Sequence, residues 1–119
     1  MTTKAEARQL AGELLRLTPI GQALQSQHDT RMDEAYDQVL AELDNYGVNV
    51  WDSTESMPDA VSPHFVALMA HNKMNVYGVS DSLYTRIVNR VGIDGHTGRQ
   101  TIKGLVNEGY SNIDEPTDY

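Results

Sequence analysis

The side chains best suited to bind a metal are four histidines, because the chain contains no cysteine: His28, His64, His71 and His96. His64 and His71 share one face of an expected helix but stand seven residues apart, which is two turns. Two ligands on one helix normally lie three or four residues apart, and those positions after His64 hold Ala67 and Leu68. We therefore expect no metal site and no cofactor, and we interpret His64 and His71 as solvent-facing or capping residues.

Acidic side chains offer the second type of chemistry, a pair of carboxyl groups acting as general acid and base. Asp33 and Asp37 lie one helical turn apart, and Glu34 has the same spacing to Gln38. Their face is opposite to the apolar stripe of the expected helix, so solvent would keep their pKa values alike. The Gly-x-Ser-x-Gly pattern of a nucleophile elbow is also absent. The sequence therefore predicts a charged outer face, and we expect no enzymatic activity.

Basic side chains are few, and four of them cluster after residue 85: Arg86, Arg90, Arg99 and Lys103. Arg86 and Arg90 stand one turn apart, and together they could contact a phosphate or an acidic partner surface. An alternative for Arg90 is a local role, since a cation stabilises the negative end of the helix dipole. The chain has 9 Lys and Arg against 17 Asp and Glu, a net charge of −8. This is the wrong sign for binding nucleic acid through its phosphates.

Length and composition place these residues in a small helical domain. The 119 residues suit one domain with a single core. No apolar stretch approaches the roughly 18 residues of a membrane helix, and the N-terminus lacks the apolar core of a signal peptide. The absence of cysteine excludes disulfides and thiolate chemistry, which is consistent with a reducing compartment.

Local signals predict four helices. Thr3 and Glu6 have the spacing of a capping box, and an apolar stripe follows until Pro19. A second helix begins at Asp29 or Thr30 and ends at Gly47. Two further helices follow Ser62-Pro63 and Ser80 and end at the next glycines, Gly78 and Gly92. Between the second and third helices we expect a short extended stretch over 48–51 and a polar loop over 52–61.

The composition changes at Gly92. The last 28 residues hold five of the nine glycines and only five aliphatic residues. We interpret residues 94–98 as a flexible hinge. Residues 97–108 could form a short helix, but its apolar side is too small to anchor it on the domain. We thus predict an all-α fold, with a bundle of about four helices over 1–91 and an extended C-terminal docking arm over 92–119. The arm's expected partner-binding residues are Ile102, Leu105, Val106, Tyr110, Ile113 and Tyr119.

The order of these elements resembles the head completion, or head-to-tail adaptor, proteins of tailed bacteriophages. The similarity covers roughly residues 4 to 91. It rests on a first helix ending in Leu14-Leu15-Arg16-Leu17, an acidic helix over 33–43 followed by Gly47-Val48-Asn49-Val50, a helix started by Pro63, and the ending Asn75-Val76-Tyr77-Gly78. The chain departs from the family pattern at Tyr46, where a tryptophan is common, and at Met74-Asn75, which replace an Ala-Pro pair.

This resemblance implies a virion protein, made in the host cytoplasm, that forms a ring under the portal at the head–tail junction. Such rings are commonly dodecameric and connect the DNA-filled head to the tail. The implied partners are the portal protein, neighbouring copies of the chain and tail or nozzle proteins, with no membrane. DNA passes through the ring without specific binding, and a surplus of negative charge suits the wall of such a channel. Arg86, Arg90, Arg99 and Lys103 become candidates for contacts with the portal or the next subunit.

Two other functions are alternatives to the adaptor. A small acidic regulatory protein, such as an inhibitor or an antitoxin-like partner, would also be helical, lack an active site and fold its tail on a target. Assembly separates this alternative from the adaptor, because an inhibitor binds its target in a small fixed ratio rather than in a ring. A helical enzyme such as a lytic muramidase needs a buried carboxyl group with a raised pKa, and the sequence offers no candidate.

Overall fold

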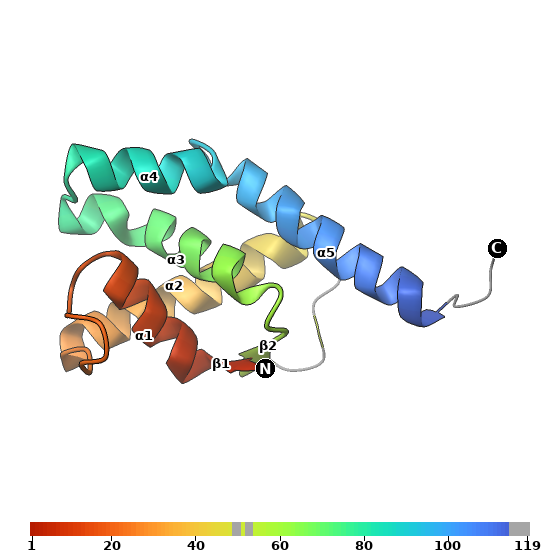
Figure 1. Cartoon of the computed structure of the whole chain (residues 1–119), viewed down its shortest axis with the longest axis horizontal. Coiled ribbons are helices and arrows are strands. Elements are labelled where there is room, and N and C mark those ends of the chain that lie inside the picture. The colour runs from red at the N-terminus through yellow and green to blue at the C-terminus, as the bar shows by residue number, and fades with distance from the viewer. Residues whose placement is uncertain (49–50, 52–53, 115–119) are drawn as a thin grey trace.

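The computed structural model describes residues 1–48, 51 and 54–114 of the chain, and it is an all-α fold (Figure 1). This confirms the predicted fold class. Two short strands accompany five helices: β1 (Thr2–Thr3), α1 (Lys4–Leu14), α2 (Ser26–Asn45), β2 (Ser56–Met57), α3 (Ser62–Tyr77), α4 (Asp81–Val91) and α5 (His96–Asp114). No helix in the described part is both long and apolar enough to cross a membrane.

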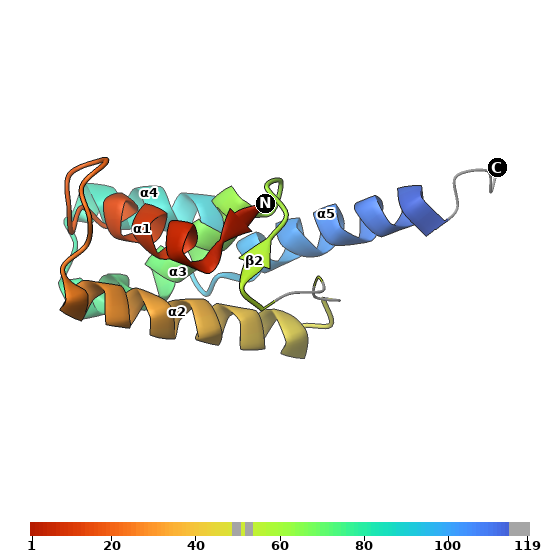
Figure 2. The same ribbon diagram turned by 90° about the horizontal axis from the view of Figure 1, so that it is seen from below.

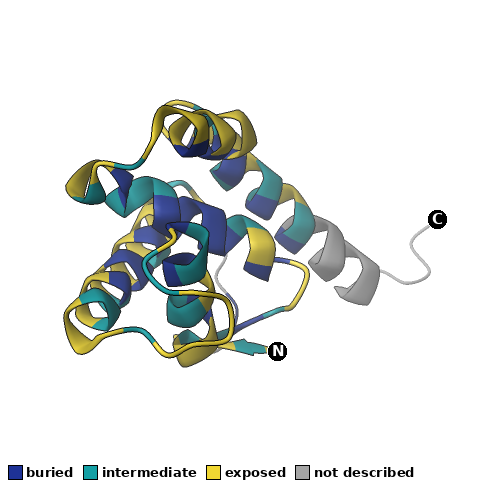
Figure 3. Cartoon of the chain, turned by 60° about the vertical axis from the view of Figure 1, so that its left-hand side comes forward, coloured by how far each residue is buried: buried dark blue, intermediate teal, exposed yellow. Residues whose placement is uncertain are grey.

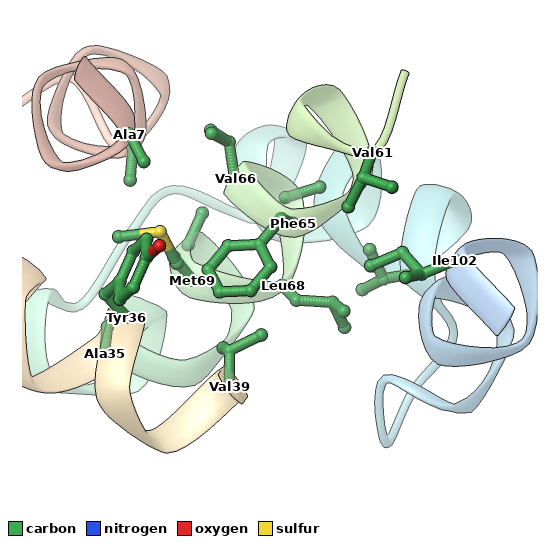
Figure 4. Close-up of a cluster of buried hydrophobic side chains, with 14 of the residues drawn as sticks. Ala7, Ala35, Tyr36, Val39, Val61, Phe65, Val66, Leu68, Met69 and Ile102 are labelled. Atoms are coloured by element: carbon green, nitrogen blue, oxygen red, sulfur yellow. The ribbon is translucent and has the colours of Figure 1, made fainter. Parts of the chain in front are cut away.

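Helix α3 lies at the centre of the fold, and all four other helices pack against it. Six consecutive residues, 65–70, are buried, so this helix is covered on every side rather than along one stripe. The Phe65 ring lies 4.9 Å from the ring of Tyr36 on α2 and 6.0 Å from that of Trp51 (centroid distances). Figure 4 shows Phe65 surrounded by Tyr36, Val39 and Leu68.

Most helix ends lie where local signals predict them. The capping box is formed, with the Glu6 amide donating to Thr3 Oγ1 and the Thr3 amide donating to Glu6 Oε1. Gly47 and Gly78 follow α2 and α3 with positive φ angles of 88° and 57°, the conformation that glycine adopts without strain. Helix α2, however, begins at Ser26, three or four residues before the predicted start at Asp29 or Thr30, and its first turn has no side-chain cap.

Two predictions for the segment before α3 are affected by the structure. Within the predicted polar loop, Ser56 and Met57 instead pair as an antiparallel strand with Thr3 and Thr2. This contact joins segments more than fifty residues apart, which no local pattern reveals. The predicted extended stretch over 48–51 lies partly outside the described residues, at 49 and 50, whereas Val48 and Trp51 are buried.

Helix α5 corrects the expectation that the tail cannot anchor itself on the domain. Ile102 is fully buried and Val106 is 8% exposed, and both belong to the core formed with α3 and α4. They are therefore not available to a partner. Figure 4 shows Ile102 pointing toward Leu68 and Val61. The close approach depends on Gly98, where an added Cβ would lie 3.0 Å from Leu68 Cδ2 and 3.1 Å from Val91 Cβ.

The turn before α5 is likewise a packed connection. Gly92 and Gly95 have φ angles of 91° and 82°, and Gly95 is buried, with Leu68 Cδ2 3.2 Å from the position of an added Cβ. The carboxylate of Asp94 accepts a hydrogen bond from the His96 amide at 3.0 Å and so caps the first turn. Residues 94–98, expected to form a flexible hinge, thus hold α5 against α3. Beyond this contact α5 extends past the other helices (Figures 1 and 2).

We expect replacement of Ile102 by Ala to lower the free energy of unfolding by about 2–5 kcal/mol, the usual range for a buried isoleucine. The measurement is urea denaturation monitored by circular dichroism. Gln100→Ala, at an exposed position of the same helix, serves as the control and should change the value by less than about 0.5 kcal/mol. Equal midpoints for Ile102→Ala and the wild type would show that α5 does not belong to the cooperative core.

Candidate functional site

An open groove of about 850 Å³ lies between α1, the segment that follows it, α3 and α4. Its surface combines apolar and cationic side chains. The apolar ones come from α1, the following segment and the start of α3: Leu10, Leu14, Leu17, Pro19, Ile20, Pro63 and Val66. The polar ones are Glu13, Arg16, Thr18, Ser62, Arg86 and Arg90. Such a mixed surface is typical of a protein-docking site.

The groove arises because the apolar stripe of α1 is wider than the face that α1 buries. Ala7 and Ala11 are fully buried and bring α1 close to α2 and α3. Leu10, one turn away on the outer edge of the stripe, is 43% exposed. Figure 3 shows this division, with buried residues where the helices face one another and exposed residues along the outer surface. The fold thus leaves part of a predicted apolar face uncovered.

The end of α1 places Arg16 in the groove through a left-handed turn. The Leu17 amide donates to the Gly12 carbonyl at 2.9 Å, and the Arg16 amide donates to the Glu13 carbonyl at 3.0 Å. These two bonds form a Schellman motif, in which glycine is the usual residue at the position of Arg16. Arg16 has a φ of 61°, a conformation that costs a residue with a Cβ roughly 1 kcal/mol. It is the one non-glycine residue with positive φ in the described part of the chain.

Glu13 holds the segment after α1 instead of neutralising the groove. Its carboxylate accepts hydrogen bonds from Gln9 Nε2 at 2.7 Å and from the Gly21 amide at 3.1 Å. These bonds, first that from Gln9 and then that from Gly21, lower the pKa of Glu13 below its usual value. Leu24 packs directly over Gly12, where an added Cβ would clash with it. The segment is therefore fixed in a position that presents Ile20, which is 89% exposed.

Three arginines surround the apolar surface: Arg16 after α1, and Arg86 and Arg90 on successive turns of α4. Within the described residues, no carboxylate lies within 4.0 Å of their guanidinium groups. Arg86 and Arg90 both line this groove, and their expected contact with a partner stays a prediction. Arg16 and Ile20 were missed, although the sequence Leu14-Leu15-Arg16-Leu17 does place a cation next to an apolar run.

The other two predicted cations lie elsewhere and contact α2. Arg99 Nη1 is 3.7 Å from Glu42 Oε2, and its guanidinium carbon lies 5.7 Å from the centre of the Tyr46 ring. Lys103 Nζ lies 5.4 Å from the same ring centre. Together they join α5 to the end of α2.

The predicted arm residues have different environments. Leu105 is half-buried beside the core residues Ile102 and Val106. The side chains of Tyr110 and Ile113, and all of Tyr119, lie outside the described residues. Their expected role in binding a partner stays a prediction.

Several histidines and carboxylates have local structural partners. No group of three His, Asp or Glu side chains suited to a metal is present in the described part of the chain. His71 Nε2 lies 2.7 Å from the Ile93 carbonyl oxygen, and His28 Nδ1 lies 3.1 Å from the Tyr77 hydroxyl. The acidic face of α2 is not simply solvated as expected, because Lys4 and Arg8 of α1 bind it.

A row of salt bridges joins α1 to α2. Arg8 Nε lies 2.9 Å from Asp29 Oδ1, and Arg8 Nη1 lies 3.1 Å from Asp33 Oδ1. Lys4 Nζ lies 3.0 Å from Asp37 Oδ1 and 3.2 Å from Asp33 Oδ1. Burial alone would lower the pKa of Lys4, but its hydrogen bonds to Asp37 and Asp33 outweigh burial and raise the pKa. These carboxylates thus bind α1 through its two basic side chains.

A second, smaller cavity of about 240 Å³ lies between α2, α3 and the start of α5. Its charged groups have partners within the fold, since Arg99 pairs with Glu42 and Asp94 caps α5. Asn72 Oδ1, which is buried there, has no hydrogen-bond partner among the described residues. With its charges paired internally, this cavity is a weaker candidate for a binding site than the groove.

We expect Arg16→Gly to stabilise the protein by about 0.5–1 kcal/mol, because glycine adopts the left-handed conformation without the steric cost of a Cβ. Arg16→Ala is the matched control, since it removes the guanidinium but keeps the Cβ. Its free energy of unfolding should stay near that of the wild type in urea denaturation. If Gly and Ala have equal stabilities at this position, the left-handed turn is not the conformation in solution.

His64, next to the groove residue Pro63, provides a second test of the local electrostatics. Burial, and then the nearby charge of Arg90, lower the pKa of His64 below its usual value. Folding therefore favours neutral His64, and its contribution to stability is full above the unfolded-state pKa and is lost as pH falls through the folded-state pKa. NMR titration of Arg90→Gln should give a higher His64 pKa than in the wild type. Arg86→Gln should leave it unchanged.

Comparison of the chain with protein-family models, with curated proteins and with solved structures finds no match.

Proposed function

We propose that this chain is a structural adaptor whose groove docks another protein segment, and that it acts as a head completion protein of a tailed phage. In this role it forms a ring under the portal, connects the head to the tail and lets DNA pass. The observation that carries the proposal is the groove, an exposed apolar surface with three arginines on a chain whose net charge is −8. Apolar contacts supply affinity at such a surface, and charges select the partner.

The carboxyl groups support a docking role over a hydrolytic one. Glycoside hydrolysis needs a carboxylic acid with a raised pKa beside a second carboxylate. Among the described residues, each carboxyl group whose pKa is displaced has a pKa below its usual value. Hydrogen bonds from Thr3 lower the pKa of Glu6, and those from Gln9 and Gly21 lower the pKa of Glu13. The hydrogen bond from the His96 amide lowers the pKa of Asp94. These groups stay ionised and serve as caps and loop contacts.

The phage setting is supported by the arrangement of the elements that carry the family resemblance. Helix α1 ends at Leu14 and the chain turns at Arg16, the acidic α2 follows, and α3 starts with Ser62-Pro63 and stops at Gly78. The net negative charge is compatible with a ring through which DNA slides, because phosphate contacts would retain the DNA.

The proposal predicts that the chain joins the portal ring encoded in the same genome. Purified chain and portal are mixed, and the mass and symmetry of the complex are measured by native mass spectrometry and electron microscopy. We expect one closed ring of the chain stacked on the portal ring. A folded chain that ignores the portal, or that binds some other protein in a small fixed ratio, would contradict the adaptor and favour the acidic regulatory protein.

Two nearly fully exposed isoleucines provide a matched pair of variants for the same mixture. Ile20, 89% exposed, lies in the groove, whereas Ile93, 79% exposed, lies outside it. Neither side chain is part of the core, so Asp at either position should leave the unfolding temperature almost unchanged. We expect Ile20→Asp to reduce incorporation into the ring, and Ile93→Asp to leave it at the wild-type level.

A further inference from the structure

The groove is an unneutralised cationic site on an acidic protein. Arg16, Arg86 and Arg90 face it, and none has a carboxylate within 4.0 Å in the described part of the chain. The groove's acidic lining residue, Glu13, is turned toward Gln9 and Gly21 instead. A segment that fills the groove must therefore bring carboxylates for the arginines, and apolar side chains for surfaces such as that of Leu10.

A segment of this composition exists in the chain itself, at residues 107–119. It contains four acidic residues and no lysine or arginine: Glu108, Asp114, Glu115 and Asp118. Among them stand one isoleucine and two tyrosines, and tyrosine is enriched among the residues that anchor an interface: Tyr110, Ile113 and Tyr119. Its charge is thus complementary to that of the groove, and its apolar residues match the groove's apolar lining.

This segment cannot fill the groove of its own molecule. No described residue after Arg90 lines the groove, and α5 leads away from α1 and α4 (Figures 1 and 2). The eight residues after Val106, ending at Asp114, continue α5 by about 12 Å. Even fully extended backwards, residues 115–119 span about 18 Å, which returns them only a few ångströms beyond the level of Val106. An occupant with this sequence must come from a second molecule.

We propose that the groove formed by α1, α3 and α4 binds the acidic segment 107–119 of a neighbouring copy of this chain. Arg16, Arg86 and Arg90 pair with its carboxylates, while Leu10, Leu17 and Ile20 contact its apolar side chains. The contact is heterologous, because the two surfaces differ, and repetition of such a contact closes into a ring when the rotation permits. The proposal deepens the proposed function and rests on it for the ring, since it names the surface that joins one subunit to the next.

A charge exchange tests the proposal. The groove variant carries Arg86→Glu and Arg90→Glu, and the tail variant carries Glu115→Lys and Asp118→Lys. In either variant alone the two surfaces repel each other, so we expect its self-association to be about tenfold weaker than that of the wild type. In an equal mixture, each surface of one variant meets an opposite charge on the other, and association returns. The measurement is size-exclusion chromatography with light scattering at one total concentration, with melting curves showing that both variants are folded.

The control variant, Arg31→Glu with Gln38→Glu and Gln100→Glu, makes the same change in net charge at exposed positions outside the groove and should associate like the wild type. Self-association of the groove variant at the wild-type level would overturn the proposal. So would a mixture that associates no better than its two components.

The portal mixture separates this proposal from the proposed function. If wild type and groove variant join the portal ring equally well, the adaptor function stands and the groove does not join the subunits. If the charge-exchanged mixture associates while the wild type ignores the portal, the groove does bind a second copy and the adaptor function fails.

Discussion

Burial of α3 is the constraint on which the rest of the structure depends. Residues 65–70 are apolar on all sides of this helix, so it needs cover from every direction. Helices α1, α2, α4 and α5 supply that cover, and each contributes mainly the side chains that face α3. The separation of α1 from α4 follows, because both pack on α3 and make little contact with each other. The groove is the space that remains between these two covering helices.

Local interactions made much of the fold predictable. The capping box at Thr3, the proline at the start of α3 and the glycines that end three helices act within one turn, so they can be recognised in the sequence. What could not be predicted involves distant segments. The β1–β2 pair is two residues long, and the position of α5 depends on the fit of Gly98 against Leu68 and Val91, so neither leaves a periodic pattern.

The candidate site, too, could be predicted only where it depends on local sequence. Arg86 and Arg90 were predicted to act together because one helical turn separates them, a relation that depends on α4 alone. Arg16 and Ile20 join them only because a left-handed turn after α1 and the bonds of Glu13 place the following segment beside α4. A site assembled from three elements has no continuous sequence motif. Its residues could be recognised one by one in the sequence, but their proximity in space could not be predicted.

The distribution of charge has consequences for assembly. Copies of a chain with net charge −8 repel one another at long range, whereas the groove arginines attract an acidic segment only at short range. Salt screens both effects, but the apolar contacts of Leu10 and Ile20 persist in salt because burial of apolar surface does not depend on net charge. Free copies must therefore overcome this repulsion when they associate, and a template that holds them side by side would offset it. Under the proposed function, the portal would be such a template and would favour a ring of copies joined through this groove.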